Sequence, residues 1–531
     1  MFKQVLAAVA SASLVAMVLL VTPVKAAGVT VNNFTIAAGG RHTCAIDTSG
    51  AAWCWGRNWD GQLGDGMGNA TGDHDMNVPT RVLGGHTFTS ITAGDFHTCA
   101  LDMSGAAWCW GDNLYGQLGD GTSDGSSDAN DANVPRAVTG GHRFTTISAG
   151  AFHTCALDTS GVAWCWGANF AFEMDDFPAG QLGDGTLDEK NAPQRVDGGG
   201  WDGTFASISA GGWHTCAITN AGAVYCWGYN EFGALGNDTT TSSLTNGPQL
   251  VDHGSSSGTF VSVDAGDLYT CALTSSGAAY CWGGNSRGRL GDGSTSDRYV
   301  PAAVTGGYVW AMIDAGDDHT CGVTTTGYGY CWGENEHGEL GDGSTLDSSS
   351  DGPQPIMFGE QFAVVIPNGF EEGNHSCGLT PDGALYCWGY NEYGQLGNHD
   401  NANSADDGPQ FVRESWMLPA GFEDDANCGT LDATVCPTIT DAGSGKLIGA
   451  PGSAAMSTPA RYTWLSCRVA GAGTTSRPSD CRAGKTVTST GARFSRVAYR
   501  ISLADRRSGY LRLAVQVRGT TYYSGTFDVR P

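Results

Sequence analysis

Apolar and polar positions alternate over short stretches along most of the chain, and glycine-rich turns separate these stretches. Phe88-Thr-Ser-Ile-Thr is one such stretch, with the alternation that is typical of a β-strand. We find no long stretch with apolar residues at i, i+3, i+4 and i+7, so amphipathic helices are not expected. The 80 glycines among the 531 residues fit many tight turns. The pattern predicts an all-β protein built from short strands.

The strand pattern itself repeats. His-Thr-Cys or a close variant recurs at intervals of 50 to 61 residues, and a second cysteine follows ten residues after the first. The seven repeats have this motif at His42, His97, His153, His214, Tyr269, His319 and His375. The strands expected in the second repeat are Phe88 to Thr92, His97 to Leu101, Ala106 to Trp110 and Val134 to Val138. Seven units of four strands predict a seven-bladed β-propeller over residues 27–413.

The spacing of the two cysteines predicts a disulfide-bonded hairpin in each repeat. In the first repeat Asp47 begins a turn, and Gly50 occupies the loop position that needs a left-handed backbone. Counting outward from this turn places Cys44 opposite Cys54, within disulfide range. Metal binding is the alternative, but no short Cys-x-x-Cys spacing occurs. The predicted pairs are Cys44 with Cys54, Cys99 with Cys109, Cys155 with Cys165, Cys216 with Cys226, Cys271 with Cys281, Cys321 with Cys331, and Cys377 with Cys387.

Two recurring residue types have both a chemical and a structural interpretation. An aromatic residue precedes the second cysteine of each pair and faces alanine or glycine across the hairpin, which indicates packing between blades; sugar stacking is the alternative. The motif histidine is present in six of the seven repeats. Because an active site needs one asymmetric set of residues, we expect this histidine to satisfy a local backbone hydrogen bond instead. No serine elbow, phosphate loop or zinc-protease motif occurs, so no catalytic residue is predicted and the chain is not expected to be an enzyme.

Two segments of the second repeat resemble the regulator of chromosome condensation repeat family. They are Ile91-Thr-Ala-Gly-Asp-Phe-His-Thr-Cys-Ala-Leu101 and Trp110-Gly-Asp-Asn-Leu-Tyr-Gly-Gln-Leu-Gly-Asp120, and their equivalents cover residues 33–413. The resemblance implies a seven-bladed propeller, and the cysteine pairs are similar to those of exported bacterial members. The founding member is a nuclear exchange factor for a small GTPase, so the family name also implies guanine-nucleotide exchange. An exported bacterial member inhibits β-lactamases, which favours a protein-binding role.

The N-terminal segment and the charge distribution bear on location and partners. Lys3 precedes an apolar run from Val5 to Val21, and Val24-Lys25-Ala26 is a small-x-small cleavage site, so residues 1–26 are typical of a signal peptide; an uncleaved anchor is the alternative. Residues 27–437 hold eleven basic and fifty acidic residues. This charge argues against nucleic-acid binding and favours cations, basic partners or solubility. We expect a secreted or cell-surface monomer with no membrane span in the mature chain.

The C-terminal part of the chain differs from the repeats. Residues 414–437 form an acidic linker in which Cys428 and Cys436 are expected to pair. Residues 438–531 hold fourteen basic and four acidic residues, and the alternating apolar residues from Leu511 to Val517 indicate a half-buried strand. This region resembles the small immunoglobulin-like repeats of bacterial surface proteins through Trp464-Leu-Ser-Cys467, Cys481, Tyr499 and the segment 509–517. The resemblance implies a small β-sandwich-like domain, and Cys467 and Cys481 are predicted to form a local disulfide.

Loops are the expected binding sites. The insertion 169–178 occurs only in the third repeat, and its apolar side chains are predicted to contact a partner: Phe170, Phe172, Met174 and Phe177. An acidic loop in the second repeat is a calcium candidate, with a solvated loop as the alternative: Asp120, Asp124, Asp128 and Asp131. No other cofactor is expected. The predicted function is an interaction or adhesion scaffold for an extracellular or envelope protein, and the alternative is calcium-dependent carbohydrate binding.

Overall fold

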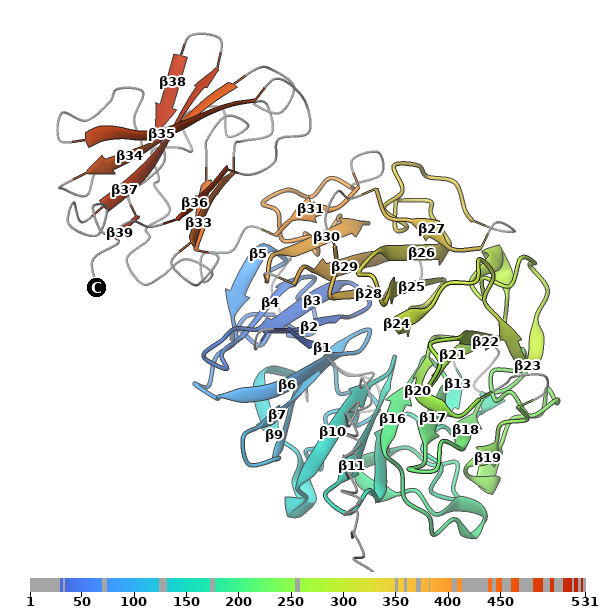
Figure 1. Ribbon diagram of the computed structural model, residues 1–531. Coiled ribbons are helices and arrows are strands. Elements are labelled where there is room, and N and C mark those ends of the chain that lie inside the picture. The colour runs from blue at the N-terminus through green and yellow to red at the C-terminus, as the bar shows by residue number, and fades with distance from the viewer. Residues whose placement is uncertain are drawn as a thin grey trace, which may run out of the picture.

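The computed structural model describes residues 29–31, 34–68, 74–123, 131–171, 177–253, 258–348, 352–357, 361–368, 374–381, 383–403 and 408–412, and strands between residues 438 and 528. Seven antiparallel sheets stand like blades around a central channel (Figure 1). Six of these sheets have four strands and the first has five. The prediction of an all-β, seven-bladed propeller is therefore confirmed.

Each blade is built from strands that follow one another in the sequence, and the first four blades have these bounds. The first is β2 (Phe34–Ala38), β3 (His42–Ile46), β4 (Ala52–Gly56) and β5 (Met76–Arg81). The second is β6 (Phe88–Ala93), β7 (His97–Asp102), β8 (Ala107–Gly111) and β9 (Ala132–Ala137). The third is β10 (Phe144–Ala149), β11 (His153–Asp158), β12 (Ala163–Gly167) and β15 (Lys190–Arg195). The fourth is β16 (Ser207–Ala210), β17 (His214–Ile218), β18 (Val224–Gly228) and β19 (Gln249–Leu250).

The remaining three blades repeat this order. The fifth is β20 (Phe260–Ala265), β21 (Tyr269–Thr274), β22 (Ala279–Gly283) and β23 (Arg298–Ala303). The sixth is β24 (Trp310–Ala315), β25 (His319–Thr324), β26 (Gly329–Gly333) and β27 (Gln354–Pro355). The seventh is β28 (Val364–Asn368), β29 (His375–Leu379), β30 (Leu385–Gly389) and β31 (Gln410–Phe411). Short 3-10 helices lie in the connections: η2 (Thr139–Gly141), η3 (Gly198–Gly200), η4 (Leu244–Asn246) and η5 (Ser286–Gly288).

The strand order defines two faces of the ring. The turn between the first and second strands and the loop after the third strand lie at the same end of each blade, as the hydrogen bond from Arg57 N to Arg41 O shows at 2.9 Å. We call this end the upper face. The second-to-third hairpin turn and the connection to the next blade meet at the other end, where Phe88 N donates to Gly50 O at 2.8 Å. We call that end the lower face.

An additional strand lies on the channel side of the first blade. Strand β1 (Val29–Val31) pairs antiparallel with β2, with Val29 opposite Ile36 and Val31 opposite Phe34. Because the first strand of each blade lines the channel, an added neighbour of β2 lies inside it. Strands β2, β3 and β4 pack against the seventh blade through Ile36, Ala45 and Trp55, so the segment near Ile36 contributes to ring closure.

The hairpin register agrees with the sequence prediction in all seven blades. In the first blade Cys44 faces Cys54, Ala45 faces Trp53, and the two cysteines form a disulfide with a Cα–Cα distance of 4.1 Å. Gly50 has a φ of 83°, the left-handed backbone that the loop requires. All fourteen cysteines of the seven hairpins are fully buried.

The other six blades contain the same bond at the same place in the hairpin, and in each the two cysteines are directly opposite one another. The bonds join Cys99 to Cys109, Cys155 to Cys165, Cys216 to Cys226, Cys271 to Cys281, Cys321 to Cys331, and Cys377 to Cys387. Each has a Cα–Cα distance of 4.1 Å. The structure therefore has the predicted disulfide in every blade, and these cysteines are not free to bind a metal ion.

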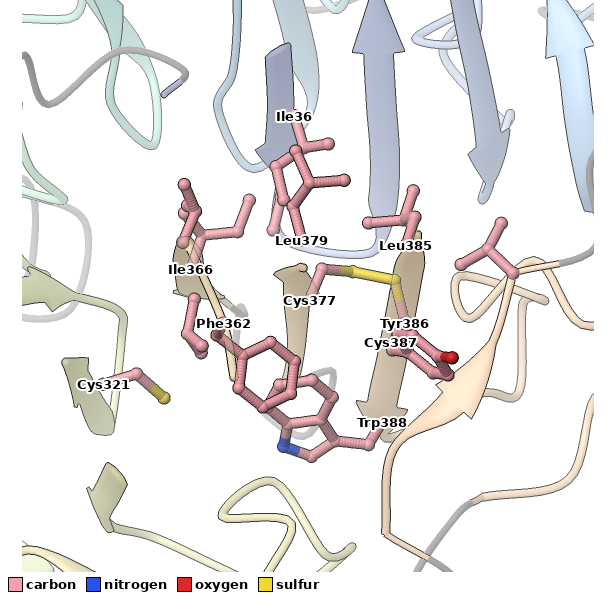
Figure 2. Close-up of a cluster of buried hydrophobic side chains, with 14 of the residues drawn as sticks. Ile36, Cys321, Phe362, Ile366, Cys377, Leu379, Leu385, Tyr386, Cys387 and Trp388 are labelled. Carbon is pink, nitrogen blue, oxygen red and sulfur yellow. A yellow bond between two sulfur atoms is a disulfide. The ribbon is translucent and has the colours of Figure 1, made fainter. Parts of the chain in front are cut away.

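The core lies between neighbouring blades. The tryptophan that follows each second cysteine, such as Trp55, is completely buried. Figure 2 shows the closing seam, where Ile36 of the first blade lies in one apolar cluster with Leu379 and Trp388 of the seventh. The aromatic residue before the second cysteine is less deeply placed, since Trp108 is half-buried and packs against the core of its seam. Its interpretation as inter-blade packing is supported by this contact.

The strands after residue 437 form two further antiparallel sheets. The three-stranded sheet is β32 (Thr438–Asp441), β33 (Lys446–Ala450) and β36 (Val497–Arg500). The second sheet is β35 (Cys481–Ser489), β34 (Ala460–Cys467), β37 (Tyr510–Val517) and β38 (Thr520–Tyr523), and β39 (Phe527–Asp528) also pairs with β37. The register places Cys467 directly opposite Cys481. The β-sandwich-like domain and this disulfide stay predictions, and Cys428 and Cys436 lie outside the described residues.

Candidate functional site

A continuous hydrogen-bonded ring joins the seven blades. The histidine of each His-Thr-Cys motif contacts the hydroxyl group of the next blade through Nε2, as His42 contacts Thr98 at 2.8 Å. The same contact recurs around the ring, although Tyr269 replaces a histidine and Ser376 replaces a threonine. The six further contacts are His97–Thr154, His153–Thr215, His214–Thr270, Tyr269–Thr320, His319–Ser376 and His375–Thr43. The histidines are therefore structural as predicted, but their partner is a side chain of the neighbouring blade and not a local backbone group.

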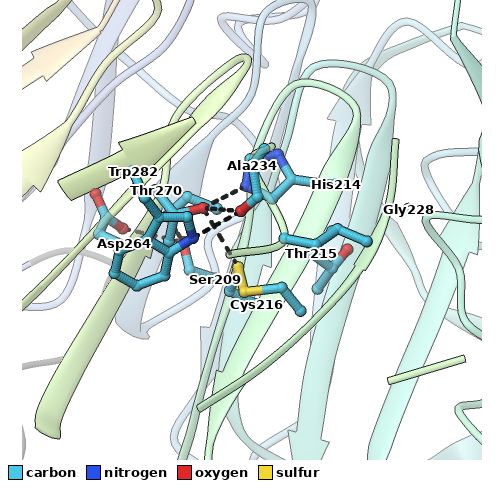
Figure 3. The surroundings of a disulfide bond; sticks show 12 residues. Ser209, His214, Thr215, Cys216, Gly228, Ala234, Asp264, Thr270 and Trp282 are labelled. Carbon is cyan, nitrogen blue, oxygen red and sulfur yellow. Dashed lines mark hydrogen bonds between the residues drawn. A yellow bond between two sulfur atoms is a disulfide. The ribbon is translucent and has the colours of Figure 1, made fainter. Parts of the chain in front are cut away.

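The hydroxyl group shows which ring nitrogen of the histidine carries a proton. Thr98 donates its only proton to the Gln62 carbonyl at 2.9 Å, so Nε2 of His42 must carry the proton of the His42–Thr98 bond. Burial lowers the pKa of His42 to about 3, with further contributions from His375, His97 and Arg57. Figure 3 shows the same arrangement in the fourth and fifth blades, where the Ala234 carbonyl accepts from both Thr270 and Trp282. These contacts hold neighbouring blades together.

The repeats diverge at the residue before the ring histidine, which lies on the upper face. In chain order this position holds Arg41, Phe96, Phe152, Trp213, Leu268, Asp318 and Asn374. Four successive blades therefore present an apolar side chain there, and the flanking blades present charged or polar ones. Since the ring itself is built from the invariant positions, this variation is available for a function other than folding.

The apolar side chains of these four blades pack into one cluster, in which Trp213 is buried and Phe96, Phe152 and Leu268 are half-buried. Phe152 stacks on Phe96 with ring centroids 5.3 Å apart and contacts Trp213 at 5.5 Å. Loops that follow the third strands add further rings, of which Tyr115 contacts both Phe152 at 5.7 Å and Phe170 at 5.0 Å. We call this surface the aromatic arc: Phe96, Phe152, Trp213, Leu268, Tyr115, Phe170, Tyr229 and Phe232. Phe96 and Phe152 are half-buried, so part of each ring faces solvent.

Charged side chains gather on the same face over the fifth and sixth blades. Arg289 occupies the position that is glutamine in four other repeats, and its buried guanidinium contacts Asp318 at 2.7 Å. Arg287 pairs with Glu334 and, at 3.1 Å, with Glu336. These contacts fix a charged sector beside the aromatic arc, and the two sectors make the upper face asymmetric.

A cavity of about 100 Å³ opens in the channel between these sectors. Its wall is formed by the upper ends of the channel-lining strands and their turns, and the carboxyl groups that line it are Asp95, Asp264, Asp267, Asp314 and Asp317. No basic side chain is among the described lining residues. Burial raises the pKa of Asp317, and the neighbouring carboxyl groups of Asp267, Asp318 and Asp95 raise it further. We call this cavity, which is lined by these five carboxyl groups, the acidic mouth.

The insertion of the third repeat lies next to the aromatic arc. Its ends form a two-stranded sheet, β13 (Phe170–Ala171) and β14 (Phe177–Pro178), in which Phe170 faces Pro178. Phe170 is half-buried and belongs to the arc. Phe172 and Met174 lie outside the described residues, and for Phe177 the structure describes the backbone. The partner-binding role of these four residues stays a prediction.

The predicted calcium loop is described at its two ends. Asp120 contacts Arg136 at 3.1 Å and accepts a hydrogen bond from Thr122 N at 2.9 Å. Asp131 accepts a hydrogen bond from Asn113 N at 2.9 Å. Asp124 and Asp128 lie outside the described residues, and within the described ranges no group of three or more His, Cys, Asp or Glu side chains could hold a metal ion. Calcium binding stays a prediction.

Sequence reasoning missed the aromatic arc and the acidic mouth. Both would have been visible from a comparison of equivalent positions across repeats. The arc follows from the residue before the ring histidine, and the acidic mouth follows from the position shared by Asp264 and Asp314 and the position shared by Asp267 and Asp317. The repeated motifs drew attention to the positions that are the same, whereas the asymmetric face is made by the positions that differ.

Comparison with known proteins assigns the repeats. The model of the regulator of chromosome condensation (RCC1) repeat matches residues 49–101 and 104–157, and the model of the RCC1-like domain matches residues 175–430. The blades thus match the RCC1-repeat family. A second RCC1-repeat model matches residues 35–62, 88–117 and 144–171. The RCC1-repeat region therefore extends over the whole propeller.

Relatives with RCC1 repeats match about half of the chain. The ultraviolet-B receptor UVR8 of Arabidopsis thaliana is 32% identical over 274 residues, which are 51% of this chain and 57% of the receptor. The human E3 ubiquitin-protein ligase HERC2 is 28% identical over 52% of this chain, but the match covers 5% of the ligase. The chain thus spans little more than half of the first relative and a small part of the second.

Solved structures agree on the fold. Yeast RCC1 (Prp20), in its complex with Kap60, superposes with a TM-score of 0.58 at 20% identity over 69% of this chain and 84% of that one. Human WBSCR16 superposes with a TM-score of 0.56 at 20% identity over 65% of this chain and 86% of that one. At this identity the likeness establishes the propeller architecture alone.

Proposed function

We propose that this chain is an exported RCC1-repeat propeller that binds a protein partner through its upper face. The observation that carries the proposal is the divergence of seven equivalent turn residues into an aromatic arc and a charged sector around one acidic mouth. Half-buried aromatic side chains gathered on one face are the usual anchors of protein interfaces. The RCC1-repeat relatives support the general role of an interaction scaffold.

Export is supported by seven buried disulfides, one in each blade. Disulfides persist in oxidising compartments and are rare in the cytosol, where thiols are kept reduced. No helix in the described part of the chain is long and apolar enough to cross a membrane. A secreted or cell-surface scaffold, with an extracellular or envelope protein as its partner, is the function that these features favour.

The test is a binding experiment with matched variants on the two faces. The full secreted chain captures partners from the envelope and culture supernatant of its own organism, and the affinity for each captured protein is then measured. Phe152→Ala removes the centre of the aromatic arc, whereas Met103→Ala removes an apolar side chain that is 79% exposed at a lower-face turn. We expect Phe152→Ala to weaken binding at least tenfold and Met103→Ala to leave it unchanged.

Melting temperatures of both variants establish that the propeller is still folded. Trp59→Ala is a second upper-face variant, because Trp59 is 44% exposed and contributes little to the core. Equal affinities for wild type, Phe152→Ala and Trp59→Ala would exclude the upper face as the binding surface.

A further inference from the structure

In the channel wall, a polar side chain of each blade from the second to the fifth accepts a hydrogen bond from the backbone of the next blade, and this series breaks at the sixth blade. In the second blade Thr92 accepts a hydrogen bond from the backbone N–H of Ala149 in the third blade at 3.1 Å. The equivalent contacts are Ala210 N to Ser148 at 3.0 Å, Ala265 N to Ser209 at 3.0 Å and Ala315 N to Asp264 at 2.6 Å. The next acceptor in the series is Asp314 of the sixth blade.

Asp314 lacks the backbone donor that its polar equivalents in the second to fifth blades have. The register aligns Ala315, opposite Thr320, with Pro367, opposite Ser376 in the seventh blade. Proline has no backbone N–H, so the step that would satisfy Asp314 is missing. Among the described residues no hydrogen bond or ion pair to its carboxyl group is found, although the group lines the acidic mouth.

Among the described residues, no basic side chain lines the cavity beside Asp314. Its neighbour Asp264 accepts hydrogen bonds from Ser209 at 2.9 Å and from Ala315 N. These two donors are bound to Asp264 and do not bind Asp314. Burial raises the pKa of Asp314 well above its usual range, and the adjacent Asp264 adds to this effect. An incoming ammonium group would favour the ionised form of these two carboxyl groups, and no described lining residue of the cavity supplies a positive group to them.

We propose that the acidic mouth receives a lysine side chain of the protein partner, with its ammonium group against Asp314 and Asp264. The inference rests on the proposed function and names the chemistry of the partner. A lysine reaches into a narrow cavity through an unbranched stem and presents three donors in a compact head, which suits two carboxyl groups on adjacent blades.

The rest of the upper face complements such a segment. Asp95, Asp267 and Asp317 lie at the rim of the same cavity and would attract a basic segment before it docks. The aromatic arc borders the rim through Phe96 and Phe152, which follow directly on the rim residues Asp95 and Ala151. Apolar residues that flank the inserted lysine would pack there. A bare metal ion fits less well, because no three ligating side chains of the described residues converge.

The experiment uses two synthetic peptides and the full secreted chain. The first peptide is acetyl-Phe-Lys-Phe-amide, and the second carries norleucine in place of lysine, which keeps the apolar stem and removes the ammonium group. Isothermal titration calorimetry measures both with wild type, Asp314→Asn and Asp197→Asn. Asp197 is an exposed carboxylate on the lower face and serves as the control. Asp314→Asn should fold well, because asparagine keeps the size of the side chain and replaces a carboxyl group whose pKa is raised with a neutral amide.

We expect the lysine peptide to bind wild type and Asp197→Asn equally, and both Asp314→Asn and the norleucine peptide to lose at least tenfold in affinity. A fourth protein, Pro367→Ala, restores the missing N–H and supplies Asp314 with an internal partner, so it should also bind the lysine peptide less tightly. Equal affinity for the two peptides, or equal affinity in wild type and Asp314→Asn, would overturn the proposal.

The two proposals can fail separately. A captured protein that loses affinity in Phe152→Ala but not in Asp314→Asn would leave the binding face intact and contradict the lysine pocket. Calcium binding that is abolished in Asp314→Asn, without binding of the lysine peptide, would also contradict it. Loss of the captured protein in both variants would support the two proposals together.

Discussion

His375 of the last blade donates its Nε2–H to the hydroxyl of Thr43 in the first blade at 2.8 Å, across 332 positions of sequence. Thr43 in turn donates to the Gln395 carbonyl at 2.9 Å, which also accepts from the Trp55 indole at 2.9 Å. The closing seam therefore has the same histidine–hydroxyl contact as the seams within the chain, and no described strand of the propeller is exchanged between the first and last blades.

Thr43→Val tests how much the closing contact stabilises the ring. The variant keeps the shape of the side chain but leaves the buried Nε2–H of His375 without an acceptor. We expect the free energy of unfolding to fall by about 1–3 kcal/mol in a urea titration. Thr87→Val, at an exposed position, is the control and should change it by less than about 0.5 kcal/mol. Similar losses of unfolding free energy in the two variants would mean that the contact between His375 and Thr43 does not stabilise the ring.

The buried histidines predict loss of stability in acid. Burial lowers the pKa of His97, His153 and His319 to about 3 and of His214 to about 4, as it does for His42. Between pH 6.5 and these values the unfolded chain binds more protons than the folded one, so stability is complete above pH 6.5 and falls as the pH is lowered. Each histidine contributes a slope of up to about 1.4 kcal/mol per pH unit.

His97→Gln isolates one of these contributions. Glutamine can still donate to Thr154 but does not titrate, so the dependence of the unfolding free energy on pH between 6 and 4 should become shallower by the share of one histidine. Urea titrations at several pH values measure it. An unchanged slope would show that His97 is not neutral and buried in the folded protein.

The raised pKa of Asp264 predicts the opposite dependence of stability on pH. Burial raises its pKa to about 7, so the folded protein binds more protons than the unfolded chain between about pH 4 and 7, and stability falls as the pH rises through this range. Asp264→Asn mimics the protonated acid. The unfolding free energy of the variant minus that of wild type should be more positive at pH 8 than at pH 4. A difference between the two proteins that is the same at both pH values would contradict a buried, protonated Asp264.

The disulfides should resist reduction until the propeller unfolds, because all fourteen cysteines are fully buried. Alkylation and mass spectrometry after treatment with dithiothreitol should find none of these cysteines modified in the native protein and all of them modified in urea. Replacement of Cys99 and Cys109 by alanine should cost about 2–3 kcal/mol at most, because the bond closes a short loop. Modified hairpin cysteines in a protein that keeps its native fluorescence would show that the hairpins open individually.

The sequence predicted those parts of the structure that depend on neighbouring residues. The turn at Asp47 and Gly50 fixes the register of its hairpin locally, so the disulfide between Cys44 and Cys54 could be derived by counting. The partner of His42 could not be derived this way, because Thr98 belongs to the next blade and meets it only once the ring has formed. The defect at Asp314 was invisible for the same reason, since it arises from Pro367 in a different blade.

The most direct test of the account is to map the binding face in solution. Hydrogen–deuterium exchange of the full chain, measured with and without a captured protein partner, reports on the turns of the two faces in one experiment. We predict protection of the upper-face turns around Phe96, Phe152 and Trp213, with no change at the lower-face turns around Met103 and Gly161. Protection confined to the lower face, or to the strands after residue 437, would contradict the account.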